Sequence, residues 1–151
     1  MTRPLLLVAN TPSANTALLA KSVAEGAAES EIAQRSLSPP DAAAEDVLAA
    51  RAIIIGTTEN FGYMSGQIKD FFERIYYPCM EKTHALPWAL YVRAGKDGAG
   101  TLRAVQSIVS GMRWRQMQPP LLLKGEWQES FPAQCKELGA TIAAGIAAGI
   151  Y

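Results

Sequence analysis

The first segment of this sequence that could do chemistry is a short run of hydroxyl and amide side chains, Thr11-Pro12-Ser13-Ala14-Asn15-Thr16. It joins an apolar run to a helical pattern, so the backbone N–H groups of the first helical turn lack helical partners. The helix dipole favours an anion at that point, and no acidic side chain in the segment opposes one. The residues predict a phosphate-binding loop, with simple helix capping by Ser13 or Asn15 as the alternative.

A second segment, Gly56 to Gly66, combines glycines, hydroxyl groups and two aromatic side chains in the order Gly-Thr-Thr-Glu-Asn-Phe-Gly-Tyr-Met-Ser-Gly. Glycine allows a planar ligand to approach the backbone closely. Phe61 or Tyr63 would be able to lie against an aromatic ring. The segment predicts contacts to a planar ligand. The alternative is an ordinary loop whose aromatic side chains fold into the core.

These segments need rigid elements to hold them, and apolar runs that alternate with helical patterns supply such elements. Strands are predicted at Leu5 to Val8, Glu31 to Leu37, Ala52 to Gly56, Trp88 to Val92 and Leu121 to Leu123. Helical patterns follow most of them, and the one that begins at Ser65 is expected to end before Pro78. Fully apolar strands require cover on both faces, which predicts an α/β fold with a doubly wound, five-stranded parallel sheet.

Ligands of such sheets bind beyond the carboxyl ends of the strands, near the point where the strand order reverses. Three connections are expected to meet at that edge: Asn10 to Thr16, Thr57 to Tyr63 and Arg93 to Gly100. The sequence thus places both segments described above, together with a third, glycine-rich one, around a single candidate site.

The same residues resemble a known family. The run from Thr11 to Thr16 resembles the phosphate loop of flavodoxins, usually Thr-x-Thr-Gly-Asn-Thr. The run from Gly56 to Lys69 is similar to that of flavodoxin-like NAD(P)H:quinone oxidoreductases of the tryptophan-repressor-binding-protein type, particularly at Phe61-Gly62 and the following Met-Ser-Gly-Gln. Over residues 4–125 the chain resembles these proteins and the NADPH-dependent FMN reductase-like group. The resemblance implies a flavodoxin-like sheet in the order 2-1-3-4-5 and FMN as the cofactor.

The resemblance also implies which residues contact FMN. The phosphate would be held by Thr11, Ser13, Ala14, Asn15 and Thr16. The ribityl chain and the isoalloxazine ring would be contacted by Thr57, Thr58, Glu59, Asn60, Phe61 and Gly62. The third edge of the pocket would be formed by Arg93, Ala94, Gly95, Gly98 and Gly100.

The implied activity is hydride transfer from NAD(P)H through FMN to a quinone, a flavin or another small acceptor, by ping-pong exchange. The redox chemistry then belongs to the flavin, and the protein positions it. Two alternatives stay open: a one-electron carrier of the flavodoxin type, and a flavin-less protein of the same fold that acts through binding partners. Related quinone reductases are oligomers, which implies a homo-oligomer.

Three departures from the family pattern bear on the cofactor. Ala14 stands where flavodoxins have glycine, and a left-handed backbone there would cost roughly 1–2 kcal/mol. Glu59 replaces the usual threonine, and its charge would disfavour an anionic reduced flavin if it pointed inward. The third connection lacks the aromatic side chain that carrier flavodoxins stack on the ring. One flavin face would then stay open, which suits hydride transfer because that step needs face-to-face contact.

The composition narrows the remaining classes of function. The 14 basic and 14 acidic side chains cancel, so no net charge attracts the protein to nucleic acid or to an anionic membrane. Cys79 and Cys135 form no CxxC pair, which predicts no metal site and suits a reducing cytoplasm. The apolar carboxyl-terminal run is shorter than the ~20 residues that cross a membrane. We therefore expect a soluble cytoplasmic protein with one domain over residues 1–151.

Two further features suggest roles at the site. The segment 93–115 holds five basic side chains against Asp97 alone, which we interpret as attraction for the phosphates of NAD(P)H. The basic residues are Arg93, Lys96, Arg103, Arg113 and Arg115. His84, the single histidine, is a candidate for protonating a quinone from the rim of the pocket, with an ordinary surface residue as the alternative.

Overall fold

The computed structural model describes residues 3–151 and has the predicted α/β fold. The sheet runs β2 (Gln34–Leu37), β1 (Leu5–Ala9), β3 (Ala52–Asn60) and β5 (Pro87–Ala94), all parallel. The next position is shared by two short parallel strands, β6 (Arg115–Gln116) and β7 (Leu121–Lys124). The order corresponds to the predicted 2-1-3-4-5, apart from this division of the fifth strand.

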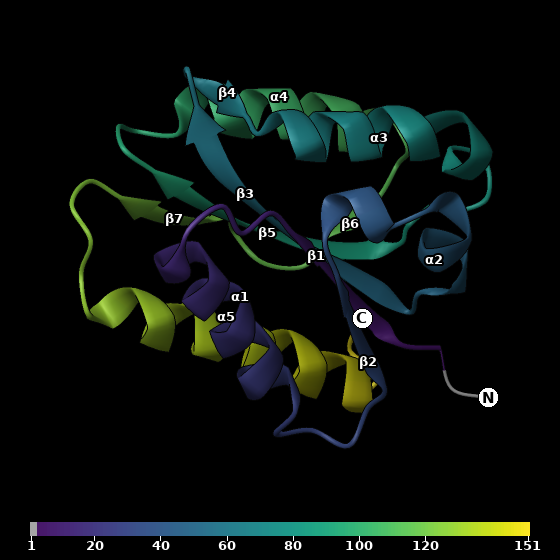
Figure 1. The fold of residues 1–151 in the computed structure, drawn as a ribbon. Coiled ribbons are helices and arrows are strands. Elements are labelled where there is room, and N and C mark those ends of the chain that lie inside the picture. Colours follow the sequence, from purple (N-terminus) through teal and green to yellow (C-terminus); the bar gives the residue numbers. More distant parts are fainter. Residues whose placement is uncertain (1–2) are drawn as a thin grey trace.

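Helices cover both faces of the sheet (Figure 1). On one face lie α1 (Ala14–Ala27) and α5 (Ser130–Ala147), and on the other lie α2 (Ala44–Ala49), α3 (Gly66–Cys79) and α4 (Ala99–Gly111). A 3-10 helix, η1 (Pro39–Asp41), links β2 to α2. Successive strand residues enter opposite cores: Ile53 and Ile55 pack on the α3 side, and Ile54 packs on the α1 side. Within the described chain, no helix is both long and apolar enough to cross a membrane.

β3 is longer than its apolar run predicts. It continues through Thr57 and Thr58, which pair with β5, and ends at Asn60. The chain then turns and returns as β4 (Tyr63–Met64), antiparallel to β3. The predicted loop from Thr57 to Tyr63 is therefore wrong in its first half, which is strand, because β-branched threonines extend the ladder that the isoleucines begin.

One proline position differs from expectation, whereas β7 begins at Leu121, directly after Pro119 and Pro120, as predicted. α3 passes through Pro78 and ends at Cys79, because the Met80 N–H still donates to the Tyr76 carbonyl at 2.9 Å and the proline removes only its own donor. The fifth strand is interrupted at Pro119 and Pro120, since neither has an N–H for the ladder with β5.

The carboxyl ends of β1, β3 and β5 lie at one edge of the sheet (Figure 1). From β1 the chain passes to α1 on one face, and from β3 it passes to α3 on the other. The two connections therefore diverge between β1 and β3, at the switch point of this topology, and leave a crevice between them.

Candidate functional site

The connection from β1 to α1 ends in a helix N-terminus that is open to an anion. Ser13 caps α1: its hydroxyl accepts the Thr16 N–H at 3.2 Å, and the Thr16 hydroxyl accepts the Ser13 N–H at 2.9 Å. Within residues 3–151, the N–H groups of Ala14 and Asn15 have no acceptor. Residues 11–15 are exposed and uncharged, so a phosphate can reach these donors at the positive end of the α1 dipole.

The alanine at position 14 causes no strain in this loop. The described non-glycine residues with left-handed backbones are Phe61, Ala85 and Arg113. Ala14 is the first residue of α1 and has no such backbone. The cost of roughly 1–2 kcal/mol, which depended on a left-handed backbone, therefore does not arise at Ala14.

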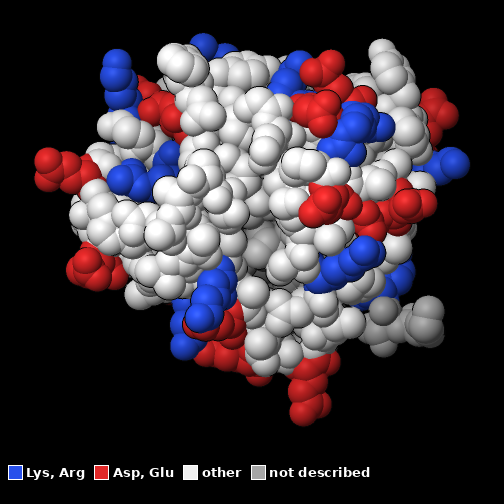
Figure 2. Space-filling view, viewed as in Figure 1, with Lys and Arg blue, Asp and Glu red and all other residues white. Residues whose placement is uncertain are grey.

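A polar hollow of about 330 Å³ lies in the crevice between the ends of β1 and β3. It is lined by Asn10, Thr11, Pro12, Ser38, Asn60, Ser65, Gly66 and Gln67. None of these residues is charged. In the space-filling view an uncharged area occupies the middle of the visible face, and charged side chains lie on both sides of it (Figure 2). The hollow therefore offers hydrogen bonds without a net charge.

Asn10 is buried and has one unused hydrogen-bonding atom. Its Nδ2 donates to the Thr58 hydroxyl at 3.3 Å, and its backbone N–H donates to the Gly56 carbonyl at 3.2 Å. In the part of the chain that the structure describes, its buried Oδ1 accepts no hydrogen bond. A buried acceptor is costly to leave unpaired, so this atom favours a ligand with hydroxyl or N–H groups. The sequence analysis placed Asn10 in the first connection but left it out of the residues that contact FMN, although its position directly after a buried strand was a usable signal.

The β3–β4 hairpin forms the second side of the crevice. The buried Thr57 hydroxyl accepts the Ser65 N–H at 3.1 Å, and the Thr58 hydroxyl donates to Asn60 Oδ1 at 2.9 Å. Phe61 occupies the turn with φ 53°, and its side chain is fully exposed. The alternative in which the aromatic residues of this segment enter the core is therefore wrong for Phe61.

Glu59 joins this hairpin to the connection between β5 and α4. Its Oε1 accepts the Lys96 N–H and its Oε2 accepts the Gly98 N–H, both at 2.9 Å. The same two segments also touch at Gly100, where a Cβ atom would come within 2.0 Å of the Gly62 carbonyl oxygen. The second and third predicted segments therefore form one continuous surface, and Gly100 is required by this close approach.

Arg93 does not present its charge to the crevice. Its guanidinium lies over the Phe131 ring, 5.1 Å from the centroid, and donates to the Leu123 carbonyl at 3.0 Å. Trp127 packs edge-on against Phe131 and completes this cluster on the α5 side. Of the other predicted residues of the third edge, Ala94 is buried and Gly95 is exposed.

The structure separates the predicted basic residues. Arg113 and Arg115 lie beside the first residues of β5, whereas Arg93 and Lys96 lie at and beyond its end. His84 precedes β5 and so lies at the amino end of the sheet. β5 has 8 residues, each rising about 3.3 Å. The single basic cluster is therefore wrong, because Arg113 and Arg115 lie a strand length away from Arg93 and Lys96. The place of His84 on the pocket rim is wrong for the same reason, since His84 lies at the amino end of β5.

The two cysteines are buried free thiols. Burial raises the pKa of Cys135 to about 12 and also raises the pKa of Cys79. Both thiols stay protonated at neutral pH, so neither is a nucleophile. The described residues contain no cluster of histidine, cysteine or acidic side chains that could hold a metal ion.

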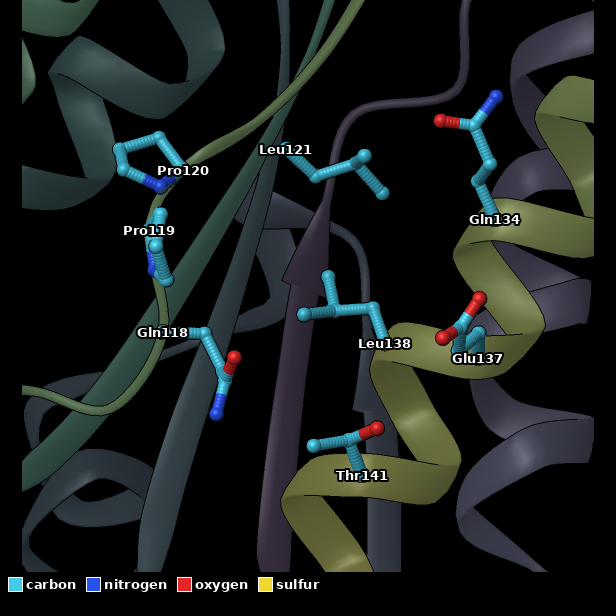
Figure 3. A pocket seen from close by; sticks show the side chains of 8 residues that line it. All are labelled: Gln118, Pro119, Pro120, Leu121, Gln134, Glu137, Leu138 and Thr141. Carbon is cyan, nitrogen blue, oxygen red and sulfur yellow. The ribbon is translucent and has the colours of Figure 1, made fainter.

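A separate hollow of about 260 Å³ lies at the edge of the sheet, between the interrupted fifth strand and α5 (Figure 3). Pro119, Pro120 and Leu121 border one side, and Leu138 and Thr141 of α5 border the other. It shares no lining residue with the crevice between β1 and β3. This hollow lies beside the outermost strand position of the sheet, away from the switch point between β1 and β3, so it is separate from the candidate site.

Comparison with known proteins identifies the family. A family model described as NADPH-dependent FMN reductase matches residues 5–129. The chain belongs to this family. The match agrees with the FMN cofactor and the NAD(P)H reductant that the motifs implied. A search of the curated proteins finds no match.

Solved structures similar to this chain include flavodoxins. A flavodoxin from the domain Archaea superposes with a TM-score of 0.82 at 19% identity, over 95% of this chain and 98% of that one. A flavodoxin, WrbA-like protein from Agrobacterium tumefaciens gives 0.77 at 19% identity, over 98% and 99%. The two-electron reduced flavodoxin of Megasphaera elsdenii gives 0.77 at 17% identity, over 93% and 98%. At these identities the likeness establishes the flavodoxin-like fold.

Proposed function

We propose that this FMN reductase family member binds FMN in the crevice between β1 and β3 and uses it to pass a hydride from NAD(P)H toward a quinone or another small acceptor. One observation carries the proposal: two free N–H donors at the start of α1 stand beside a polar hollow lined by Asn10, whose buried Oδ1 accepts no hydrogen bond within residues 3–151. A phosphate would pair with the donors, and a ribityl hydroxyl would line the hollow beside Asn10.

The residues of the β1–α1 connection would bind the phosphate. The N–H groups of Ala14 and Asn15 are free to donate, while the Ser13 and Thr16 hydroxyls hold the cap in shape. No acidic side chain lies between Asn10 and Thr16, so nothing in this segment repels a dianion. The site thus fits FMN at its charged end.

The other end of the crevice would border the flavin ring. There the hairpin and the Lys96–Gly98 connection are held together by Glu59. Bound FMN supplies the redox chemistry, since its ring can take up a hydride and release the electrons in a later step. Residues 95–100 contain no aromatic side chain, so they leave the ring accessible for the face-to-face contact that a nicotinamide or a quinone needs.

A visible absorbance scan tests the proposal. The purified protein is titrated with FMN and then mixed anaerobically with NADH or NADPH. We expect a bound-flavin band that bleaches with a reduced nicotinamide and returns when a quinone is added. A protein that binds no FMN at high micromolar concentration contradicts the cofactor site and favours the flavin-less alternative.

A one-electron carrier is the second candidate, and two observations favour it. The chain matches a whole archaeal flavodoxin in fold, and the fully exposed Phe61 offers an apolar contact for an electron-transfer partner beside the crevice. In that case the flavin band persists with both nicotinamides and disappears with dithionite. The same scan therefore separates the two candidates.

The proposed setting is the cytoplasm, where the two buried thiols would stay reduced. We also propose a homo-oligomer, by analogy with related quinone reductases. Light scattering of the FMN-loaded protein during size-exclusion chromatography measures its mass, and a monomer at micromolar concentration contradicts this part of the proposal.

A further inference from the structure

Glu59 is the one side chain that ties the second connection of the site to the third by hydrogen bonds. It is the next-to-last residue of β3 and accepts the N–H groups of Lys96 and Gly98 with its two separate oxygens, at 2.9 Å each. Hydrogen bonds to an ionised acceptor are roughly twice as strong as neutral ones. The hydrogen bond to Gly98 is partly buried, which limits competition from water there, whereas the one to Lys96 is exposed. The contact is therefore strong enough to decide where this connection lies.

Backbone donors alone hold this carboxylate. The ion pairs among the described residues join other side chains, and Lys96 contributes its backbone N–H to the contact. α4 begins directly after Gly98, so the carboxylate also lies at the positive end of the α4 dipole. The negative charge of Glu59 is thus fixed in place and is not cancelled by a cation.

A second contact restricts the same two segments. Gly100, in the first turn of α4, lies directly against the Gly62 carbonyl of the hairpin turn. The other side-chain hydrogen bond of the connection is local, because Asp97 accepts the N–H of Ala99, two residues further along the chain. The connection between β5 and α4 is therefore anchored to the hairpin at two points, and Glu59 supplies the one that a substitution can remove without a steric clash.

We infer that Glu59 is a positioning residue of the flavin site: it holds the β5–α4 connection against the end of β3 and keeps an uncancelled negative charge beside the crevice. The redox consequence rests on the proposed function. A flavin ring gains negative charge on reduction at neutral pH, and a fixed carboxylate nearby opposes that gain. The site then binds reduced FMN less tightly than it otherwise would, which makes the bound cofactor a stronger reductant.

Hydrogen–deuterium exchange of the FMN-free protein tests the positioning role. Glu59→Gln removes the charge, and Glu73→Gln removes an equal charge from the exposed face of α3. We expect exchange at the Lys96 and Gly98 amides to rise at least tenfold in E59Q and to stay unchanged in E73Q. Glu59→Asp keeps the charge but shortens its reach, so its exchange rises as well. Wild-type exchange in E59Q and E59D overturns the inference.

FMN binding in two redox states tests the role of the charge. Titrations with oxidised and dithionite-reduced FMN give the ratio of the two dissociation constants. We expect E59Q to shift this ratio about tenfold in favour of reduced FMN, which equals about +30 mV for a two-electron couple. E59D and E73Q keep a ratio close to that of the wild type. An unchanged ratio in E59Q overturns the charge role.

The two tests separate this inference from the proposed function. A wild-type protein that binds no FMN contradicts the proposed function and the redox consequence together. The exchange experiment needs no FMN, so it still decides whether Glu59 positions the connection.

Discussion

The two ends of the sheet differ in which ends of the helices lie beside them. At the carboxyl end the helices begin, and the free N–H groups of Ala14 and Asn15 stand beside an uncharged hollow. At the amino end the helices finish, and Arg3 donates to carbonyls at the end of α2, to Ala50 at 2.6 Å and more weakly to Leu48 and Ala49. The helix dipole accounts for the difference, since it favours anions at helix starts and cations at helix ends.

This difference shows why charge counted along the sequence is a poor guide to a binding surface. Four of the five basic residues of the segment 93–115 divide between the two ends of β5, and the fifth, Arg103, lies in α4. Two of them already have aromatic partners. Arg93 lies over Phe131, and Arg115 lies over the Tyr151 ring at 5.9 Å from the centroid. The chain has zero net charge, and the carboxyl end of its sheet is open to an anion because backbone N–H donors are free there. No cluster of lysines and arginines is needed at that end.

Asn15→Asp is expected to have the largest effect, because it places a carboxylate where the phosphate would bind. FMN affinity falls about 100-fold, or about 2.7 kcal/mol. Thermal stability stays the same or rises by up to ~1 kcal/mol, since the new charge suits the α1 dipole. FMN fluorescence titration and a thermal melt measure the two quantities. Gln106→Glu, on the exposed face of α4, is the matched control and changes neither. Unchanged FMN affinity in N15D contradicts phosphate binding at the start of α1.

Gly100→Ala tests the contact that joins the hairpin to α4. The added Cβ meets the Gly62 carbonyl, so we expect about 1–3 kcal/mol of lost stability and displacement of the third connection. Gly66→Ala is the matched control at the start of α3, where nothing lies within 4 Å of the added atom. Urea unfolding of the two variants gives the difference. Equal stability in G100A and G66A contradicts the close approach.

Arg3→Ala probes the amino end and is expected to change stability without changing the site. Removing the donors to the carbonyls at the end of α2 costs about 1 kcal/mol. FMN affinity stays within twofold, because the crevice lies at the other end of the sheet. Arg103→Ala removes an exposed cation of α4 and is expected to stay within about 0.5 kcal/mol of the wild type. A large loss of FMN affinity in R3A contradicts the separation of the two ends.

His84→Ala is expected to have the smallest effect. The side chain is exposed before β5, at the end of the sheet opposite the crevice. NADPH:quinone reductase assays from pH 6 to 8 measure kcat and KM for both proteins, and we expect the profiles to agree within twofold. A tenfold fall in kcat supports His84 as a proton donor and contradicts a reaction site in the crevice.

Much of the fold follows from local patterns that the sequence displays directly. Uninterrupted aliphatic runs such as Ile53–Ile55 predict buried parallel strands, and the spacing of Ile68, Phe71, Phe72 and Ile75 predicts the buried face of α3. Parallel strands with helical crossovers bring their carboxyl ends to one edge, so the meeting of the three connections also follows from the order of elements. The ends of elements were less predictable, as the extension of β3 through Thr58 and of α3 through Pro78 shows.

The sequence by itself determined the fold class and the family motif and predicted a phosphate-binding segment, because each depends on residues close together along the chain. Tertiary structure alone decided the direction of the side chains that shape the site. Glu59 binds N–H groups 37 and 39 residues away, Asn10 reaches Thr58 and leaves its Oδ1 unpaired, and Arg93 turns to α5. The direction of each of these side chains depends on which segments pack beside it. A hydrogen bond between segments distant in sequence forms only when the sheet has brought them together.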